Sequence, residues 1–204
     1  HWLNEEINTN GKTLIRVGIS DQHLQKDVEK NLDDWLKSPL SLLFFKHIRK
    51  LKIGVRELNW IRQSSGPVPD SEWMRLSEKP EDPCLVIRSV EESFPSDALS
   101  EIKQERMLGV EEESDFPPCK IEIVLGAKGR LYVVLPTGVE TKLPFACNAP
   151  FIQDPARMKI KDPETSPTNR WLLERAGQLA ASTMLNWLGS EKIPAIERAD
   201  AYSL

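Results

Sequence analysis

CKIEIVLGAKGRLYVVLP, residues 119–136, carries the strongest β-strand signal in this chain. Apolar and polar residues alternate in 119–125 and again in 130–136, as in strands that bury one face. Gly126 and Gly129 flank the short segment between them, where a tight turn fits. The stretch therefore predicts an antiparallel hairpin.

Similar patterns on either side of this stretch predict the rest of an α+β fold. Strands are expected over 50–54, 56–63 and 83–90, and helices over 96–106 and from Ser166 to Gly189. An acidic surface loop is expected over 109–118. This order of elements predicts a mixed or antiparallel sheet with helices covering one face.

The first forty residues are predicted to contain a strand and a connecting helix. Residues 12–18 alternate like a strand, and Ser20 or Asp21 can cap a helix that follows. That helix repeats apolar residues at helical spacing, so one side of it should pack against another element. These residues are Leu24, Val28, Leu32 and Trp35.

Composition limits the classes of function. The chain has 204 residues and a net charge of -4, which argues against binding nucleic acid with its whole surface. No apolar run approaches the ~18 residues of a membrane span. Three widely spaced cysteines, Cys84, Cys119 and Cys147, are best explained as buried, reduced thiols of a cytoplasmic protein.

Motifs of self-contained enzymes are missing from the sequence. It has no phosphate-binding glycine loop, no dinucleotide-binding glycine pattern, no paired zinc histidines and no nucleophile elbow. Its histidines, His1, His23 and His47, have no partner at ligand spacing. Catalytic chemistry must therefore be sought in a less common pattern.

Three cations at alternate positions supply such a pattern. Arg157, Lys159 and Lys161 lie in LPTGVETKLPFACNAPFIQDPARMKIKD, residues 135–162. In an extended segment they would share one face, and Met158 and Ile160 would turn inward. Such a group can neutralise charge on a transferred phosphoryl group. The alternative is a basic strand edge that forms ion pairs, and its carboxylates would come from three nearby residues: Asp154, Asp162 and Glu164.

Four segments make the chain resemble sacsin-type repeats of the GHKL superfamily, to which the ninety-kilodalton heat-shock chaperone, DNA gyrase and sensor histidine kinases belong. They are PLSLLFFKHIRKL (39–51), GRLYVVLPT (129–137), LPFACNAPF (143–151) and NRWLLE (169–174). The likeness covers most of residues 12–188 and is strongest over 135–174.

The resemblance implies a transducer region, with a βαβ arrangement like that of ribosomal protein S five. In this family a nucleotide-binding domain holds ATP and magnesium, and the next domain directs a cationic loop to the terminal phosphate. Residues 1–20 would contribute the last strand of the nucleotide-binding domain, 21–165 the transducer, and 166–204 a helix and connector tail. Asn148 and Arg157 resemble the asparagine and catalytic arginine of the chaperone's loop, and Lys159 and Lys161 are alternative catalytic cations.

The superfamily's nucleotide-binding motifs are not in these residues. We therefore expect the chain not to hydrolyse ATP alone, and to complete an ATPase together with the nucleotide-binding domain as its partner. The family also leaves open a homodimer, a DNA or protein client, a chaperone-like role and a link to bacterial defence. A nucleic-acid-binding or scaffolding module without an ATPase role is the alternative function, and the acidic composition counts against it.

Overall fold

The computed structural model describes residues 18–19, 21–37, 39–107 and 116–204. By its contacts the chain divides into two compact units, residues 1–38 and Pro39–Leu204. Most of the strand expected over 12–18 and of the acidic loop expected over 109–118 lies outside the described residues, as does the Trp35 side chain.

Helix α1, Gln22–Lys37, is the described element of the first unit. Asp21 caps it, because the Asp21 carboxylate accepts hydrogen bonds from the backbone N–H groups of His23 at 2.7 Å and Leu24 at 2.9 Å. The helix and its cap are confirmed. Leu24, Val28 and Leu32 are 50%, 42% and 41% exposed, so the expected packing of this side stays a prediction.

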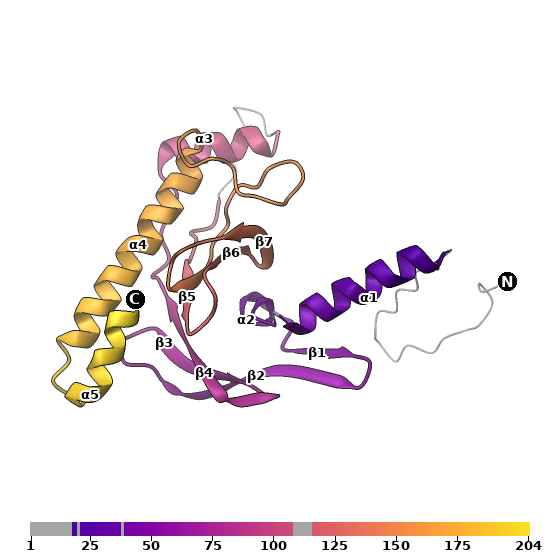
Figure 1. The fold of residues 1–204 in the computed structure, drawn as a ribbon. Coiled ribbons are helices and arrows are strands. Elements are labelled where there is room, and N and C mark those ends of the chain that lie inside the picture. Colours follow the sequence, from indigo (N-terminus) through magenta and orange to yellow (C-terminus); the bar gives the residue numbers. More distant parts are fainter. Residues whose placement is uncertain (1–17, 20, 38, 108–115) are drawn as a thin grey trace. The chain divides into compact units, whose positions relative to one another are not determined.

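The second unit is built on an eight-stranded mixed sheet with the strand order β1-β2-β3-β4-β5-β8-β6-β7 (Figure 1). Neighbouring strands are antiparallel except β6 and β8. The strands are β1 Lys50–Ile53, β2 Arg56–Ser65, β3 Ser71–Leu76, β4 Lys79–Arg88, β5 Glu122–Leu125, β6 Arg130–Val133, β7 Leu135–Glu140 and β8 Phe145–Asn148. The strands expected in 50–63 and 83–90 are confirmed.

The expected hairpin between β5 and β6 is wrong. Strand β8 lies between them, antiparallel to β5 and parallel to β6. The second strand also ends early, because the chain reverses at Val134, whose φ is +63°, and returns as β7. Alternation predicted both strands, but pairing depended on β8, whose first three residues are buried and need neighbours on both sides.

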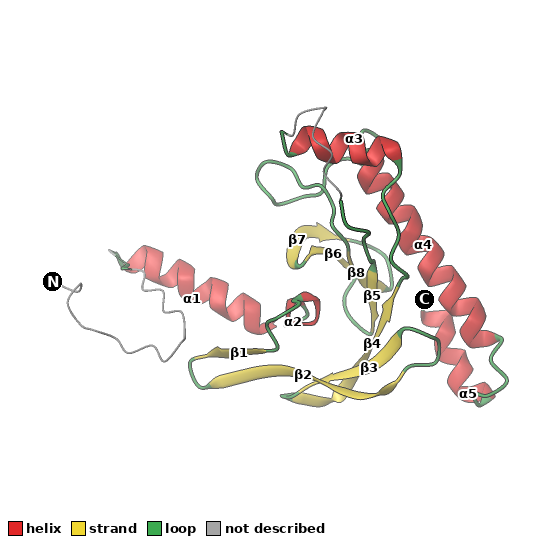
Figure 2. Cartoon of the chain, turned by 180° about the vertical axis from the view of Figure 1, so that it is seen from behind, coloured by secondary structure: helices red, strands yellow, loops and turns green. Residues whose placement is uncertain are grey.

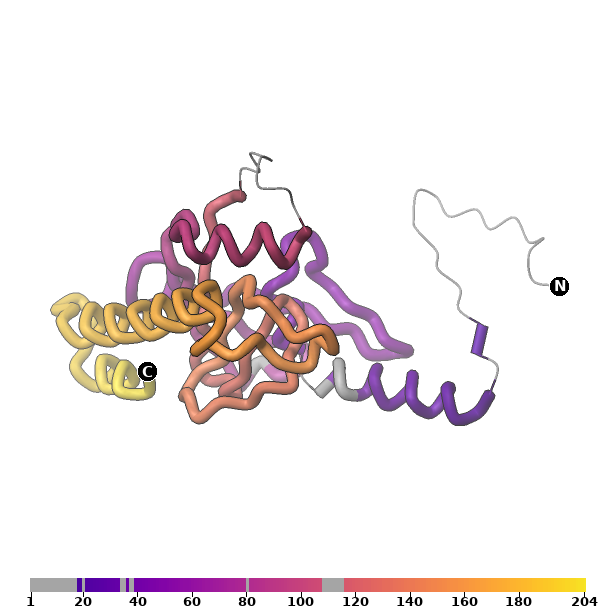
Figure 3. The backbone as a smooth tube through the Cα atoms, turned by 90° about the horizontal axis from the view of Figure 1, so that it is seen from above, coloured from indigo at the N-terminus to yellow at the C-terminus, as the bar shows by residue number. Residues whose placement is uncertain are grey.

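The α+β class with a mixed sheet is confirmed (Figure 2). The expectation that helices cover one face is wrong, because α4 packs on one face of the sheet and α2 on the other. Helix α4, Pro167–Leu188, begins at the Ser166 cap as expected and ends at Gly189. Figure 3 shows α3, Ser96–Glu105, beside α4. A βαβ unit needs a helix between two parallel strands. Helix α3 connects β4 to β5, which are antiparallel, and the parallel strands β6 and β8 are connected through β7. The described pairings therefore do not form the βαβ unit that the resemblance implied.

The two sheet faces have separate cores. On one face, Leu85, Ile87, Ile123 and Cys147 pack with Leu172, Ala176, Ala180 and Trp187 of α4. The chain end joins this core through Ala201 of the 3-10 helix η1, Ala199–Ser203, which follows α5, Ala195–Arg198. The segment 166–204, expected as a helix and connector tail, is thus part of the same compact unit as the sheet.

On the other face, Val86, Val124 and Tyr132 pack with Leu43 and Phe44 of the one-turn helix α2, Ser41–Phe44. Cys84, Cys119 and Cys147 are buried and free, as expected. Burial raises the pKa of Cys84 and of Cys147 to about 12. None of the described helices is both long and apolar enough to cross a membrane.

Candidate functional site

The expected cationic segment forms a hairpin over residues 152–161, which we call the cationic hairpin. Its two arms meet through the Gln153–Ile160 bridge and a hydrogen bond of 2.8 Å from the Lys161 N–H to the Ile152 carbonyl. The tip turns at 154–157, where the Arg157 N–H donates to the Asp154 carbonyl at 2.8 Å. Arg157 has a φ of +55°, so the tip is not an extended strand.

This turn changes the expected directions of the side chains. Met158, expected to turn inward, is 60% exposed. Ile160 packs, as expected, against the core on the sheet face that α4 covers. Arg157 and Lys159 are exposed at the tip and form no ion pair with a described residue. Strict alternation failed because a left-handed residue within the segment rotates the backbone that follows it.

Lys161 lies at the base and is bound to α3. Its ammonium group lies 2.6 Å from Glu105 and 3.4 Å from Glu101. The hydrogen bond with Glu105, together with the nearby charges of both carboxylates, raises the pKa of Lys161. Ion pairing was the alternative expected for these cations, and the structure confirms it for Lys161 alone, with carboxylates of α3 rather than of the loop.

Asp154, expected as an ion-pair partner, instead shapes the tip. Its carboxylate accepts the backbone N–H groups of Met158 at 2.8 Å and Lys159 at 3.0 Å. The Met158 carbonyl accepts the Gly138 N–H of β7 at 2.6 Å. A Cβ added at Gly138 would lie 2.8 Å from that carbonyl oxygen, so the close approach requires glycine.

Asn169 of α4 holds the base of the hairpin. Its side chain is fully buried, accepts the Ile152 N–H at 2.8 Å, and donates to the carbonyls of Ile152 at 2.8 Å and Lys161 at 2.9 Å. Sequence reasoning noted Asn169 only as part of a family-like segment. An asparagine just after the N-cap of a helix was the available signal, but no neighbouring residue in the sequence identified Ile152 and Lys161 as its hydrogen-bond partners.

Glu101 of α3 is a second residue that sequence reasoning missed. Its carboxylate accepts hydrogen bonds from the Ser166 hydroxyl at 2.9 Å and the Thr168 N–H at 3.0 Å, at the start of α4. Burial opposes ionisation, but these bonds and the contact with Lys161 outweigh it and lower the pKa of Glu101. One carboxylate thereby joins α3, α4 and the hairpin base.

Asn148 does not join the cations. It ends β8, where its amide oxygen accepts the Val134 N–H at 2.8 Å and its amide nitrogen donates to Glu122 at 2.9 Å. Among the described residues, no hydrogen bond links Asn148 to Arg157, Lys159 or Lys161. The amide instead supports the left-handed turn at Val134.

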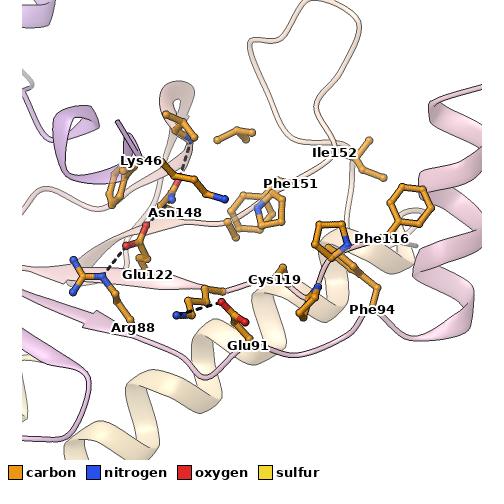
Figure 4. A pocket seen from close by; sticks show the side chains of 18 of the residues that line it. Lys46, Arg88, Glu91, Phe94, Phe116, Cys119, Glu122, Asn148, Phe151 and Ile152 are labelled. Carbon is orange, nitrogen blue, oxygen red and sulfur yellow. Dashed lines mark hydrogen bonds and ion pairs between the residues drawn. The ribbon is translucent and has the colours of Figure 1, made fainter. Parts of the chain in front are cut away.

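Asn148 also lines a cleft of about 850 Å³ on the sheet face that α2 covers in part. Figure 4 shows a row across its floor in which Arg88, Glu122 and Asn148 are joined by hydrogen bonds and an ion pair. Phe94, Phe116 and Phe151 lie farther along the same cleft (Figure 4). This cleft was not predicted, because its walls come from segments far apart in sequence.

Comparison of the chain with protein-family models, with curated proteins and with solved structures found no match. The likeness to sacsin-type proteins therefore rests on the motifs of this sequence.

Proposed function

We propose that the chain is the transducer region of a sacsin-like GHKL ATPase, and that the cationic hairpin presents Arg157 to the terminal phosphate of ATP held by another domain. The observation that supports this most is the contrast within the hairpin. Two cations at its tip are exposed and form no ion pair within the described part of the chain, whereas its base is held by the fully buried Asn169.

A fixed base and an exposed tip suit an arginine that acts on a phosphate group held by another domain. An exposed cation that already has a carboxylate partner would have to lose it before binding phosphate, and Lys161 is in that position. Arg157 has no such competitor among the residues that the structure describes, and its planar guanidinium matches two phosphate oxygens. Arg157 is therefore assigned as the finger, with Lys159 as an adjacent positive charge.

The contacts of the hairpin also supply a route for coupling. Its base is bonded to α4 through Asn169 and to α3 through Lys161, and its tip is bonded to β7 through Gly138. Force on the tip would reach two helices and one edge strand of the sheet. Hydrolysis would then release the tip from the phosphate and change the forces that the hairpin exerts on α3, α4 and β7.

Magnesium and the adenosine end of ATP are assigned to the nucleotide-binding domain. Within the described residues, no group of three or more His, Cys, Asp or Glu side chains is placed to hold a metal ion. The residues of this chain therefore contribute charge stabilisation and positioning, and the tip cations would meet only the phosphate end of the nucleotide.

The test measures ATP hydrolysis in a chain that contains both the nucleotide-binding domain and these residues. Arg157→Ala is expected to lower kcat on the order of 10³-fold, because removal of an arginine finger has effects of this size. Lys159→Ala is expected to lower it less, about fivefold, because a neighbouring charge in contact with water contributes about 1 kcal/mol. Arg170→Ala is the matched control, since Arg170 is also exposed and without an ion pair to a described residue.

Two results would contradict the proposal. The first is an unchanged kcat for Arg157→Ala in the longer chain. The second is hydrolysis by the isolated 204 residues that Arg157→Ala abolishes, because the site would then be complete within this chain.

A further inference from the structure

The cleft on the partly covered sheet face has the size of a small-molecule site. Its volume is about 850 Å³, and ligand pockets typically measure about 300–1,000 Å³. Its walls come from α2, α3, β4, β5, β6 and β8 and from segments next to them. A cavity shared by so many elements is held in shape by the fold itself.

One part of the wall is aromatic. Five phenylalanines line the cleft, and three of them, Phe44, Phe45 and Phe151, come from α2 and the segments after α2 and β8. The other two, Phe94 and Phe116, are half-buried. Phe44 and Phe151 are buried with only a small part of each side chain open, so Phe45, Phe94 and Phe116 supply most of the ring surface open to an apolar or aromatic body.

The charges around this wall are unbalanced. Five basic and three acidic side chains line the cleft, although the whole chain has a net charge of -4. Every one of these carboxylates is already engaged by a cation: Glu91 by Lys120, Glu105 by Lys161 and Glu122 by Arg88.

Three cations remain without a carboxylate among the described residues. Lys46, Arg49 and Arg106 are exposed at the cleft, and Arg106 lies 5.1 Å from the centre of the Phe116 ring. An arginine held over a ring keeps its edge N–H groups available for an anion. The cleft thus combines apolar surface with positive charge that no described carboxylate pairs with.

The geometry points to a binding site for a small organic anion with an aromatic or apolar body, such as an aryl carboxylate. The body would pack against Phe94, Phe116 and Phe151, and the anionic group would meet Lys46, Arg49 or Arg106. The cleft adjoins the base of the cationic hairpin through Ile152 and Glu105, but Arg157 and Lys159 at the tip do not line it, so its ligand is a second input to the protein. The assignment does not depend on the proposed ATPase role.

Calorimetry with 1-naphthylacetate as the probe, and neutral 1-naphthylacetamide as its isostere, tests the site in the 204-residue chain. The anion is expected to bind at least about tenfold more tightly than the amide at low salt, and the difference should shrink as salt screens the cations. The double variant Lys46→Ala, Arg49→Ala should weaken the anion about tenfold and leave the amide unchanged. Phe116→Ala should weaken both.

The control is Lys142→Ala, Lys192→Ala, which removes two exposed lysines outside the cleft. It should leave both affinities unchanged, and urea midpoints equal to that of the parent chain will show that each variant is folded. Equal binding of anion and amide, no binding of the anion at millimolar concentration, or an anion affinity insensitive both to the double variant and to Arg106→Ala overturns the assignment. Displacement of naphthylacetate by tightly bound single-stranded DNA would also overturn it, in favour of a polymeric anion.

Discussion

One face of the sheet packs against the long helix α4 and the C-terminal 3-10 helix, whereas the opposite face meets the single turn of α2 and then opens into the cleft. Successive residues of strand β4 contribute to these two faces in turn. In β4, Leu85 and Ile87 enter the first core, Val86 enters the second, and Arg88 reaches the cleft floor. The closed face stabilises the domain, and the open face leaves side chains free to bind.

The largest expected effect is a loss of packing on the closed face. Leu172→Ala removes a fully buried side chain of α4 and should lower the free energy of unfolding by about 3–4 kcal/mol. Leu43→Ala on the open face should cost less, about 2 kcal/mol, because the surface beside α2 can adjust. Urea unfolding of both variants measures the difference, and an equal or reversed order would contradict the comparison.

The next effect concerns the helix that closes the first face. Asn169→Ala leaves the backbone groups of Ile152 and Lys161 without their partner and should cost about 2–3 kcal/mol. It should also speed hydrogen exchange of the hairpin amides. Asn186→Ala, at an exposed position of the same helix, is the control and should do neither. Protection that survives in Asn169→Ala would show that Asn169 is not the brace.

A smaller effect should depend on pH. Because the pKa of Glu101 is lowered on folding, its ionised form adds stability that is complete above the pKa in the unfolded chain, about 4.3, and is lost as the pH falls through the folded value. Glu101→Gln should cost about 1–2 kcal/mol at pH 7 and much less at pH 3. Urea midpoints between pH 3 and 7 measure this. Glu191→Gln, at an exposed position, serves as the control, and a cost that stays constant with pH would refute the role of the charge.

The smallest effect is expected at the floor of the open cleft. Arg88 and Glu122 lie 3.1 Å apart, with side chains 30% and 17% exposed. A double-mutant cycle of Arg88→Ala and Glu122→Ala should give a coupling of about 0.5–1 kcal/mol that falls with added salt. A coupling of several kcal/mol, insensitive to salt, would mean that this floor is as closed as the opposite face.

Local patterns predicted the individual elements well. The Ser166 cap, the helix that ends at Gly189, the strands of 50–63 and 83–90 and the buried thiols are all present. Each depends on residues within one or two turns of the chain or on simple alternation. The prediction for 119–136 failed in the pairing of its two strands. Alternation within a strand is the same whichever strand lies beside it, so it could not show that β8 lies between β5 and β6.

The candidate site was predicted less well than the fold. Lys161 leaves the group of cations because Glu101 and Glu105, some sixty residues earlier, attract it. Asn148 is separated from Arg157 because a left-handed turn at Val134 requires its amide. None of these partners lies in the loop itself, so the spacing of loop residues could not predict the contacts. Arg157 and Lys159 remain exposed and form no ion pair with a residue that the structure describes.

The sequence by itself determined the helices α1, α3 and α4, the strands of 50–63 and 83–90, the buried cysteines, and where positive charge accumulates near Arg157, because periodicity and composition act over short stretches. The tertiary structure alone decided that β8 separates β5 from β6, that Asn169 braces the hairpin, and that the walls of the cleft meet. These outcomes depend on contacts between distant residues, where burial and hydrogen bonding are settled by competition among many partners.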